Sequence, residues 1–163
     1  MGAVSAGGEL NQPNTIDGCK DGDAGTNSDT DEGLEKIVVR SGDLSGNGAG
    51  VDIREGGSIT ITATVWADSE NFQSDYADFY HASDFGLFVT WELIGTVQAT
   101  QGKMNELKMT YTLPPGSSSY QAVRVQFRYQ GSSSSACDKS GEGGKWNDRD
   151  DLIFRVQQSM PVS

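Results

Sequence analysis

A strict two-residue alternation of apolar and polar side chains is the feature that most constrains how this chain can fold. Between Ser58 and Trp66, one set of alternate positions is apolar and the other is threonine: Ile59, Ile61, Ala63 and Val65 against Thr60, Thr62 and Thr64. Successive side chains of a β-strand point to opposite faces, so this segment predicts a strand with one face in a core and one toward solvent. No segment of ten to twelve residues has the 3.6-residue period of an amphipathic helix.

The same alternation recurs along the chain, with Gly, Asp, Asn, Ser and Pro between the runs. Predicted strands cover about residues 34–41, 51–53, 58–66, 78–82, 87–94, 107–113, 123–130 and 152–157. Short strands at this spacing, without an internal repeat, predict an all-β fold, an antiparallel two-sheet β-sandwich, jelly-roll-like, with about eight strands.

The length of 163 residues fits one domain. Residues 1–15 are rich in Gly, Ala and Asn without periodicity, which predicts a disordered leader. The single sandwich domain is then expected over 16–157, with 158–163 as a tail.

The net charge of −11, from 23 acidic and 12 basic residues, limits the partners. Such a surface repels phosphate backbones and anionic membranes, so no nucleic acid is expected as a partner. No apolar run approaches the roughly 20 residues of a membrane span, so no membrane insertion is expected. Acidic loops suit hard cations, or simply keep a chain solvated.

The two cysteines, Cys19 and Cys137, lie far apart in polar, Gly-rich segments. Without a CxxC spacing they make a poor metal site, and we interpret them as a disulfide, the alternative being two unrelated buried thiols. A disulfide implies an oxidising compartment and an extracellular, secreted protein.

Residues suited to catalysis are few. His81 is the only histidine, whereas zinc hydrolases use two or three, and neither HExxH nor GxSxG occurs. We interpret His81 as a surface residue at the end of a strand. The sequence therefore predicts a protein that is not an enzyme. A small carboxylate-dependent glycan hydrolase or lyase is an alternative, because paired carboxylates are abundant.

Acidic clusters predict structural Ca²⁺. Four potential oxygen ligands precede the last strand, in Asn147-Asp148-Arg149-Asp150-Asp151, and Asp78 with Asp75 borders another strand. The predicted metal ligands are Asp78, Asp148, Asp150 and Asp151. A further cluster comprises Asp17, Asp21, Asp23, Asp29, Asp31 and Glu32. Solvated turns are the alternative for each cluster.

Aromatic and basic residues are the candidates for ligand binding. Trp146 lies in a polar loop beside the acidic cluster, and Trp66 ends the Thr-faced strand, whereas the parity of Trp91 favours the core. Exposed aromatic rings stack on sugars or grip peptides. Arg124 and Arg128 share one strand face, interpreted mainly as solvated and paired with acids, or as a platform for an acidic glycan. The predicted ligand-binding residues are Trp146, Trp66, Tyr80, Arg124 and Arg128.

Five stretches resemble a C-terminal accessory β-sandwich module of secreted microbial hydrolases, especially extracellular metalloproteases and other multidomain peptidases. They are the segments 56–66, 78–84, 111–114, 121–131 and 147–154, and both cysteines fit the module. The resemblance implies an appended domain without the catalytic machinery of its neighbour.

Taken together, the sequence predicts a calcium-stabilised, non-catalytic module. It would tether a parent secreted hydrolase to a polysaccharide, glycan or protein surface. A structural or adhesive spacer domain without a ligand pocket is the main alternative.

Overall fold

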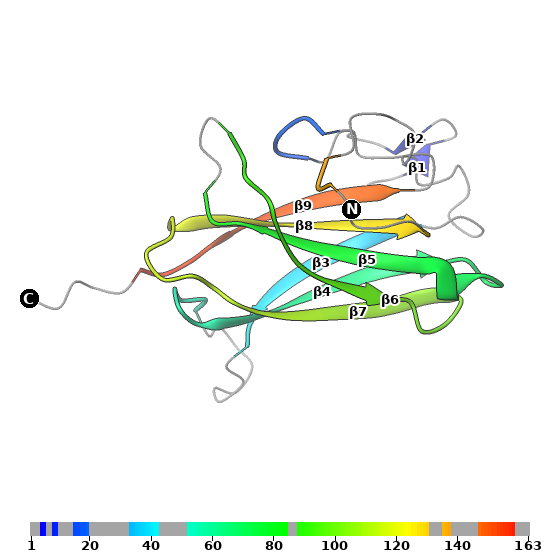
Figure 1. Cartoon of the computed structure of the whole chain (residues 1–163), viewed down its shortest axis with the longest axis horizontal. Helices are drawn as coiled ribbons and strands as arrows, with labels where there is room; N and C mark the ends of the chain where they lie inside the picture. The colour runs from blue at the N-terminus through cyan, green and yellow to red at the C-terminus, as the bar shows by residue number, and fades with distance from the viewer. Residues whose placement is uncertain are drawn as a thin grey trace, which may run out of the picture.

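The computed structural model describes residues 4–5, 8–9, 15–19, 33–42, 52–84, 88–130, 135–137 and 147–158. Within them the chain is all-β, and two antiparallel sheets lie against each other as two layers (Figure 1). One sheet has the order β3-β4-β7, formed by β3 (Gly33–Ser41), β4 (Ser58–Ala67) and β7 (Lys103–Thr112).

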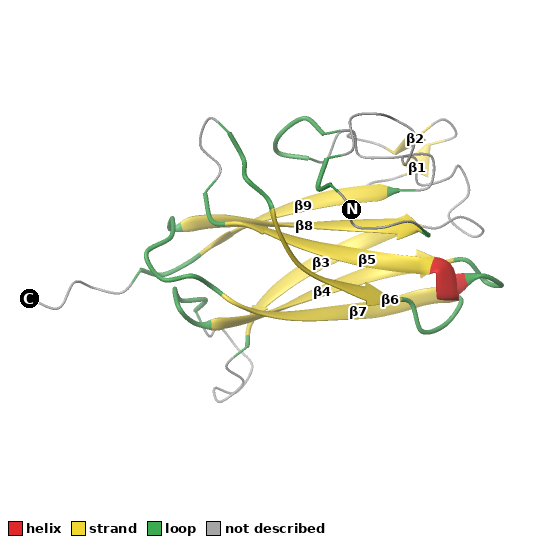
Figure 2. Ribbon diagram, viewed as in Figure 1, coloured by secondary structure: helices red, strands yellow, loops and turns green. Residues whose placement is uncertain are grey.

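The second sheet has four strands in the order β6-β5-β8-β9. They are β5 (Asp75–Ala82), β6 (Glu92–Gln98), β8 (Tyr120–Tyr129) and β9 (Asp148–Arg155). A pair of two-residue strands, β1 (Val4–Ser5) and β2 (Gly8–Glu9), stands apart from both sheets. In the described part of the chain the only helix is the single 3-10 turn η1 (Phe72–Ser74) before β5 (Figure 2).

The core lies between the sheets and follows the alternation of the sequence. In β4 every second residue from Ile59 to Ala67 is buried, while the threonines between them face outward. In β8, Val123, Val125 and Phe127 point into the same core. Burying one face of each sheet against the other is what stabilises a sandwich of this kind.

The two-sheet sandwich is therefore confirmed, with seven strands in its sheets where about eight were predicted. The segment 51–53 was predicted as a strand, and this is wrong for its described residues: Ile53 packs against the core, and only Arg54 makes an isolated bridge, to Gln157. Sheets of three and four strands match an immunoglobulin-type sandwich better than an eight-stranded jelly roll.

The strand predicted over 87–94 begins later, at Glu92, and continues to Gln98. A bulge between Phe79 and Tyr80 in the pairing of β5 with β6 shifts the register here. The predicted leader contains β1 and β2, and the rest of it lies mostly outside the described residues. Where the chain is described, no helix has the length and apolar character needed to span a membrane.

Candidate functional site

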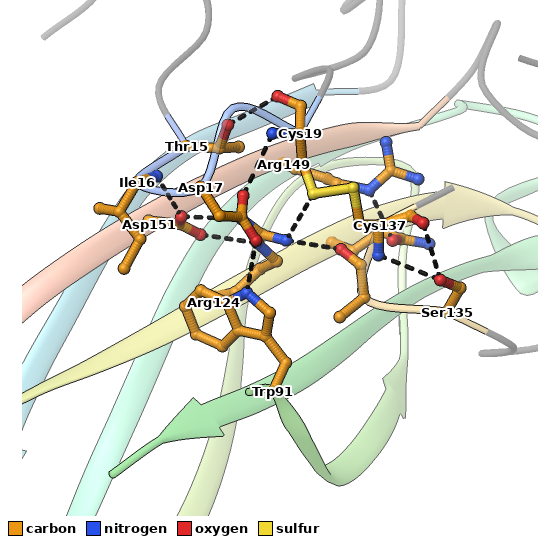
Figure 3. The surroundings of a disulfide bond; sticks show 12 residues. Thr15, Ile16, Asp17, Cys19, Trp91, Arg124, Ser135, Cys137, Arg149 and Asp151 are labelled. Atoms are coloured by element: carbon orange, nitrogen blue, oxygen red, sulfur yellow. Dashed lines mark hydrogen bonds and ion pairs between the residues drawn. A yellow bond between two sulfur atoms is a disulfide. The ribbon is translucent and has the colours of Figure 1, made fainter. Parts of the chain in front are cut away.

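The outer face of the four-stranded sheet carries polar side chains that are buried. In β8, Arg124, Gln126 and Arg128 alternate with the core residues and so point away from the core, yet all three are buried. The residues 15–19 and 135–137 lie over this face, and a disulfide joins them (Figure 3). Loop segments thus close a face that alternation alone would assign to solvent.

Arg124 is the centre of this covered region. Its Nε and Nη2 donate to the two carboxylate oxygens of Asp151, the cross-strand neighbour on β9, at 2.7 and 2.9 Å. Nη2 also donates to Oδ1 of Asp17 at 2.7 Å. Nη1 donates to the carbonyl oxygen of Ala136 at 2.7 Å and contacts Sγ of Cys19 at 3.2 Å. Every nitrogen of the guanidinium has a partner, as a buried arginine requires.

Asp17 collects donors from three directions. Besides Arg124, it accepts hydrogen bonds from Nε1 of Trp91 at 2.9 Å and from the backbone N–H of Cys19 at 3.1 Å. Burial acts to raise the pKa of Asp17, but the bonds from Arg124, Trp91 and Cys19 outweigh it and lower the pKa. The indole of Trp91 also lies 4.4 Å from the guanidinium carbon of Arg124, in cation–π geometry.

The disulfide between Cys19 and Cys137 confirms the sequence interpretation, with Cα atoms 5.5 Å apart. The N–H of Ile16 donates to Oδ2 of Asp151 at 2.8 Å, and the hydroxyl of Thr15 donates to the carbonyl oxygen of Cys19 at 2.6 Å. A covalent bond and a set of charged hydrogen bonds therefore hold the same segment on the sheet. We call residues 15–19, residues 135–137 and Arg124 the clasp.

A second buried ion pair lies further along the same face. Nε of Arg128 donates to Oδ2 of Asp78 at 2.6 Å, and both side chains are almost inaccessible to solvent. The hydroxyl of Thr96 donates to the other oxygen of Asp78 at 2.6 Å, while the guanidinium of Arg128 lies 4.8 Å from the ring of Tyr76. Both arginines are paired with acids as predicted, but the expectation of a solvated arginine face is wrong because both side chains are buried.

Tyr80 lies opposite Arg124 in the register of β5 and β8. It is 3% exposed, and its hydroxyl has no hydrogen-bond partner in the described structure. Burial, and then the negative charge of Asp78, raise the pKa of Tyr80 to about 12. The hydroxyl is therefore protonated at neutral pH.

The sequence analysis interpreted His81 as a surface residue, and this is wrong because the side chain is buried. It follows the parity of Ala77 and Phe79 on the inner side of β5, and it is only 2% exposed. Its Nε2 lies 2.6 Å from Oε1 of Gln121, and its ring centroid lies 4.9 Å from that of Tyr111. Burial lowers the pKa of His81, against the opposing effect of the bond to Gln121.

The predicted metal ligands do not converge. Asp78 and Asp151 are paired with arginines on the outer face, whereas Asp148 is buried and accepts the N–H of Leu34 at 2.6 Å. Asp150 lies opposite Val125, on the inner side of β9. The residues that the structure describes contain no group of three or more His, Cys, Asp or Glu able to hold a metal ion. The acidic residues between Asp21 and Glu32 lie outside the described part, so calcium binding stays a prediction.

The predicted ligand-binding residues also separate. Tyr80, Arg124 and Arg128 are buried, and Trp146 lies outside the described residues. Trp66 is half-buried on the outer face of the three-stranded sheet, opposite Met104. The parity of Trp91 favoured the core, but its ring instead lies over the guanidinium of Arg124. The only feature of the sequence that could have indicated this contact is the position of Trp91 directly before β6.

No protein-family model matches this chain, and no curated protein matches it significantly.

Proposed function

We propose that this chain is a non-catalytic, extracellular binding module whose ligand face is the outer face of the three-stranded sheet. The supporting observation is a contrast between the two outer faces. The face of the four-stranded sheet is occupied by internal ion pairs and covered by the clasp. The other face is regular and mostly polar, and most of its side chains on β3 and β7 are exposed in the described structure.

The open face is a ladder of hydroxyls with one aromatic end. Thr60, Thr62 and Thr64 run along the central strand β4, and Trp66 continues the same row. Their neighbours on β3 and β7 also point outward, and they include Thr110, Lys108, Glu106, Arg40, Val38 and Lys36. We call these residues, with Met104, the threonine face. Flat arrays of hydroxyls and a Trp side chain suit a polymer that offers hydroxyls and sugar rings.

The absence of catalysis in this proposal is supported by where the reactive groups lie. The one histidine of the chain is buried against Gln121 and Tyr111. A glycosidase needs two carboxyl groups flanking a substrate, roughly 5–10 Å apart. Asp78 and Asp151 instead hold Arg128 and Arg124. Acid–base chemistry by these carboxylates would break buried ion pairs.

The extracellular setting is supported by the disulfide, because such bonds persist in oxidising compartments. The role as an appendage of a secreted hydrolase is supported by the resemblance of the sequence. Stabilisation by Ca²⁺ belongs to the same proposal and is supported by the acidic composition.

A spacer domain without a ligand is the second candidate. The clasp favours it, since buried ion pairs and a disulfide between distant segments make a stiff unit. A spacer predicts no saturable adsorption to any polymer.

Adsorption of the protein to a panel of insoluble polysaccharides tests the proposal. We expect saturable binding that Trp66→Ala weakens by about tenfold, since losing an aromatic side chain that anchors the ligand costs about 1.4 kcal/mol. The matched control is Tyr120→Ala, because Tyr120 is an aromatic residue 53% exposed on the other sheet. If Trp66→Ala bound as tightly as the parent chain, or if both variants lost affinity equally, the threonine face would not be the ligand-binding face. A complete lack of adsorption would favour the spacer.

A further inference from the structure

Three of the six exposed basic residues in the described structure lie on the threonine face. Although the net charge is −11, Lys36, Arg40 and Lys108 all point outward from this one face and are exposed. The other exposed basic residues of the described structure are Arg54, Lys103 and Arg155. Glu106 is the one acidic residue paired in register on the threonine face, and Glu35 lies at the bulge of β3.

The three cations surround the central row of threonines. In register, Arg40 lies beside Thr60 and Lys36 beside Thr64 on one side, while Lys108 lies beside Thr62 on the other. From strand geometry, Lys36 and Arg40 are about 13 Å apart along β3, and Lys108 is about 10 Å across the sheet. One small anion cannot reach all three groups. A polymer with anionic groups at intervals can.

The ion pair already on the face is weak. Nζ of Lys108 lies 3.5 Å from Glu106, and the two side chains are 59% and 64% exposed. Exposed pairs of this kind contribute little, so a ligand anion can replace Glu106 at small cost. Lys108 is therefore available to a ligand despite its neighbour.

We propose that the threonine face binds an anionic polysaccharide, with Lys36, Arg40 and Lys108 contacting its carboxylate or sulfate groups. This inference rests on the proposed binding function and specifies the charge of the ligand. The hydroxyls of Thr60, Thr62 and Thr64, each a donor and an acceptor, pair with sugar hydroxyls between the charged groups. A nucleic acid is a worse fit, because it offers few sugar hydroxyls to the row of threonines.

The test compares polymers that differ only in charge. Polygalacturonate and its methyl ester share one backbone, and dextran sulfate and dextran make a second matched pair. We expect the full chain to bind the charged member of at least one pair about tenfold more tightly. That factor corresponds to three exposed ionic contacts of ordinary strength.

A pair of triple variants assigns the effect to the face. Lys36→Gln/Arg40→Gln/Lys108→Gln should lose about tenfold in affinity for the charged polymer, at an unchanged unfolding midpoint. Arg54→Gln/Lys103→Gln/Arg155→Gln changes the net charge equally, away from the threonine face, and should bind within about twofold of the parent chain.

The outcomes separate the two proposals. Equal binding of charged and neutral polymers, with Trp66→Ala still defective, would overturn the anionic ligand and keep the binding module. An equal loss in both triple variants would also overturn it, since net charge alone would explain the affinity. Polyglutamate binding as tightly as the polysaccharides would replace it with an acidic polypeptide ligand. Binding to none of the polymers would contradict both proposals.

Discussion

Asp78 and Arg128 show how much a single side chain can matter in this protein. Replacing Asp78 by Asn keeps the shape but removes the carboxylate charge that Nε and Nη2 of the buried Arg128 contact. Removing one partner of a buried pair costs about 3–5 kcal/mol. We expect Asp78→Asn to lower the free energy of unfolding by about this amount, measured by urea denaturation.

Glu106→Gln provides the control, because it removes a carboxylate from the exposed pair with Lys108. Its expected cost is within about 1 kcal/mol. If the Asp78 variant were no less stable than the Glu106 variant, the ion pair of Asp78 would be solvated. The same expectation holds with and without a chelator, since the described partners of Asp78 are Arg128 and Thr96.

His81 makes a clean pH reporter because the chain has no other histidine. Burial lowers its pKa below the ordinary value of 6.5, so between the folded and unfolded pKa values the unfolded chain binds more protons. Stability should therefore fall as the pH drops below 6.5, until the folded pKa is reached. We expect His81→Gln to flatten the unfolding free energy over this window.

The parent chain and the His81→Gln variant are compared by the slope of their unfolding free energy against pH. The comparison therefore stays valid if the variant is less stable at every pH. An NMR titration of His81 with a midpoint at or above 6.5 would show that the imidazole is solvated.

Asp17 has a lowered pKa in the folded state. Its contribution to stability is therefore present above the pKa of an unfolded carboxyl group and is lost as the pH falls through the folded pKa. The two groups thus act in different pH ranges.

At the scale of elements, the clasp is the feature most open to experiment. The bond joins positions 118 residues apart, and chain entropy assigns such a loop about 5 kcal/mol. Native disulfides typically contribute 2–5 kcal/mol, and we expect Cys19→Ser/Cys137→Ser to lose an amount in that range. Urea denaturation measures the loss, with the chemically reduced parent chain as the reference.

Trp91 reports whether the clasp stays closed in that variant. Its indole contacts Asp17 and Arg124, so release of residues 15–19 exposes it to water and shifts its fluorescence to the red. Trp91→Phe in the same background identifies the signal. An unshifted spectrum in the reduced protein would mean that Arg124 holds the segment without the disulfide.

Alternation predicted most strands and their inner faces, as in β4 and β8, because a half-buried strand needs one apolar side. It could not predict that Arg124 is buried, since the covering residues 15–19 and 135–137 have no periodicity. Nor could it predict that Arg128 is buried beside Asp78 and the ring of Tyr76. Pairing partners such as Asp78 with Arg128 depend on strand order and register, which a single sequence does not contain. For the same reason, the sequence could not show that Asp78 of β5 and Asp151 of β9, predicted as metal ligands, are paired with arginines.

At the scale of the molecule, the two outer faces of the sandwich differ in how far they are covered. Residues 15–19, residues 135–137 and the disulfide between them cover part of one face, where Arg124 is paired with Asp17 and Asp151. Among the described residues the other face stays uncovered, and it carries three exposed basic side chains, Lys36, Arg40 and Lys108. A sandwich partly covered on one side and uncovered on the other suits a module that holds a ligand without transforming it.

Calcium binding is a prediction about the whole molecule, and it is tested by thermal unfolding of the non-reduced chain with Ca²⁺ and then with excess EGTA. A ligand bound only by the folded state raises the midpoint, so we expect chelation to lower it. Asp151 holds Arg124, and Asp151→Asn should therefore lower stability while keeping a response to calcium. Asp21→Asn/Asp23→Asn, in the acidic segment, should reduce that response. Loss of the calcium response in Asp151→Asn alone would place the metal site at the clasp. The absence of any response in the parent chain would contradict calcium binding, and it would not affect the proposal for the threonine face.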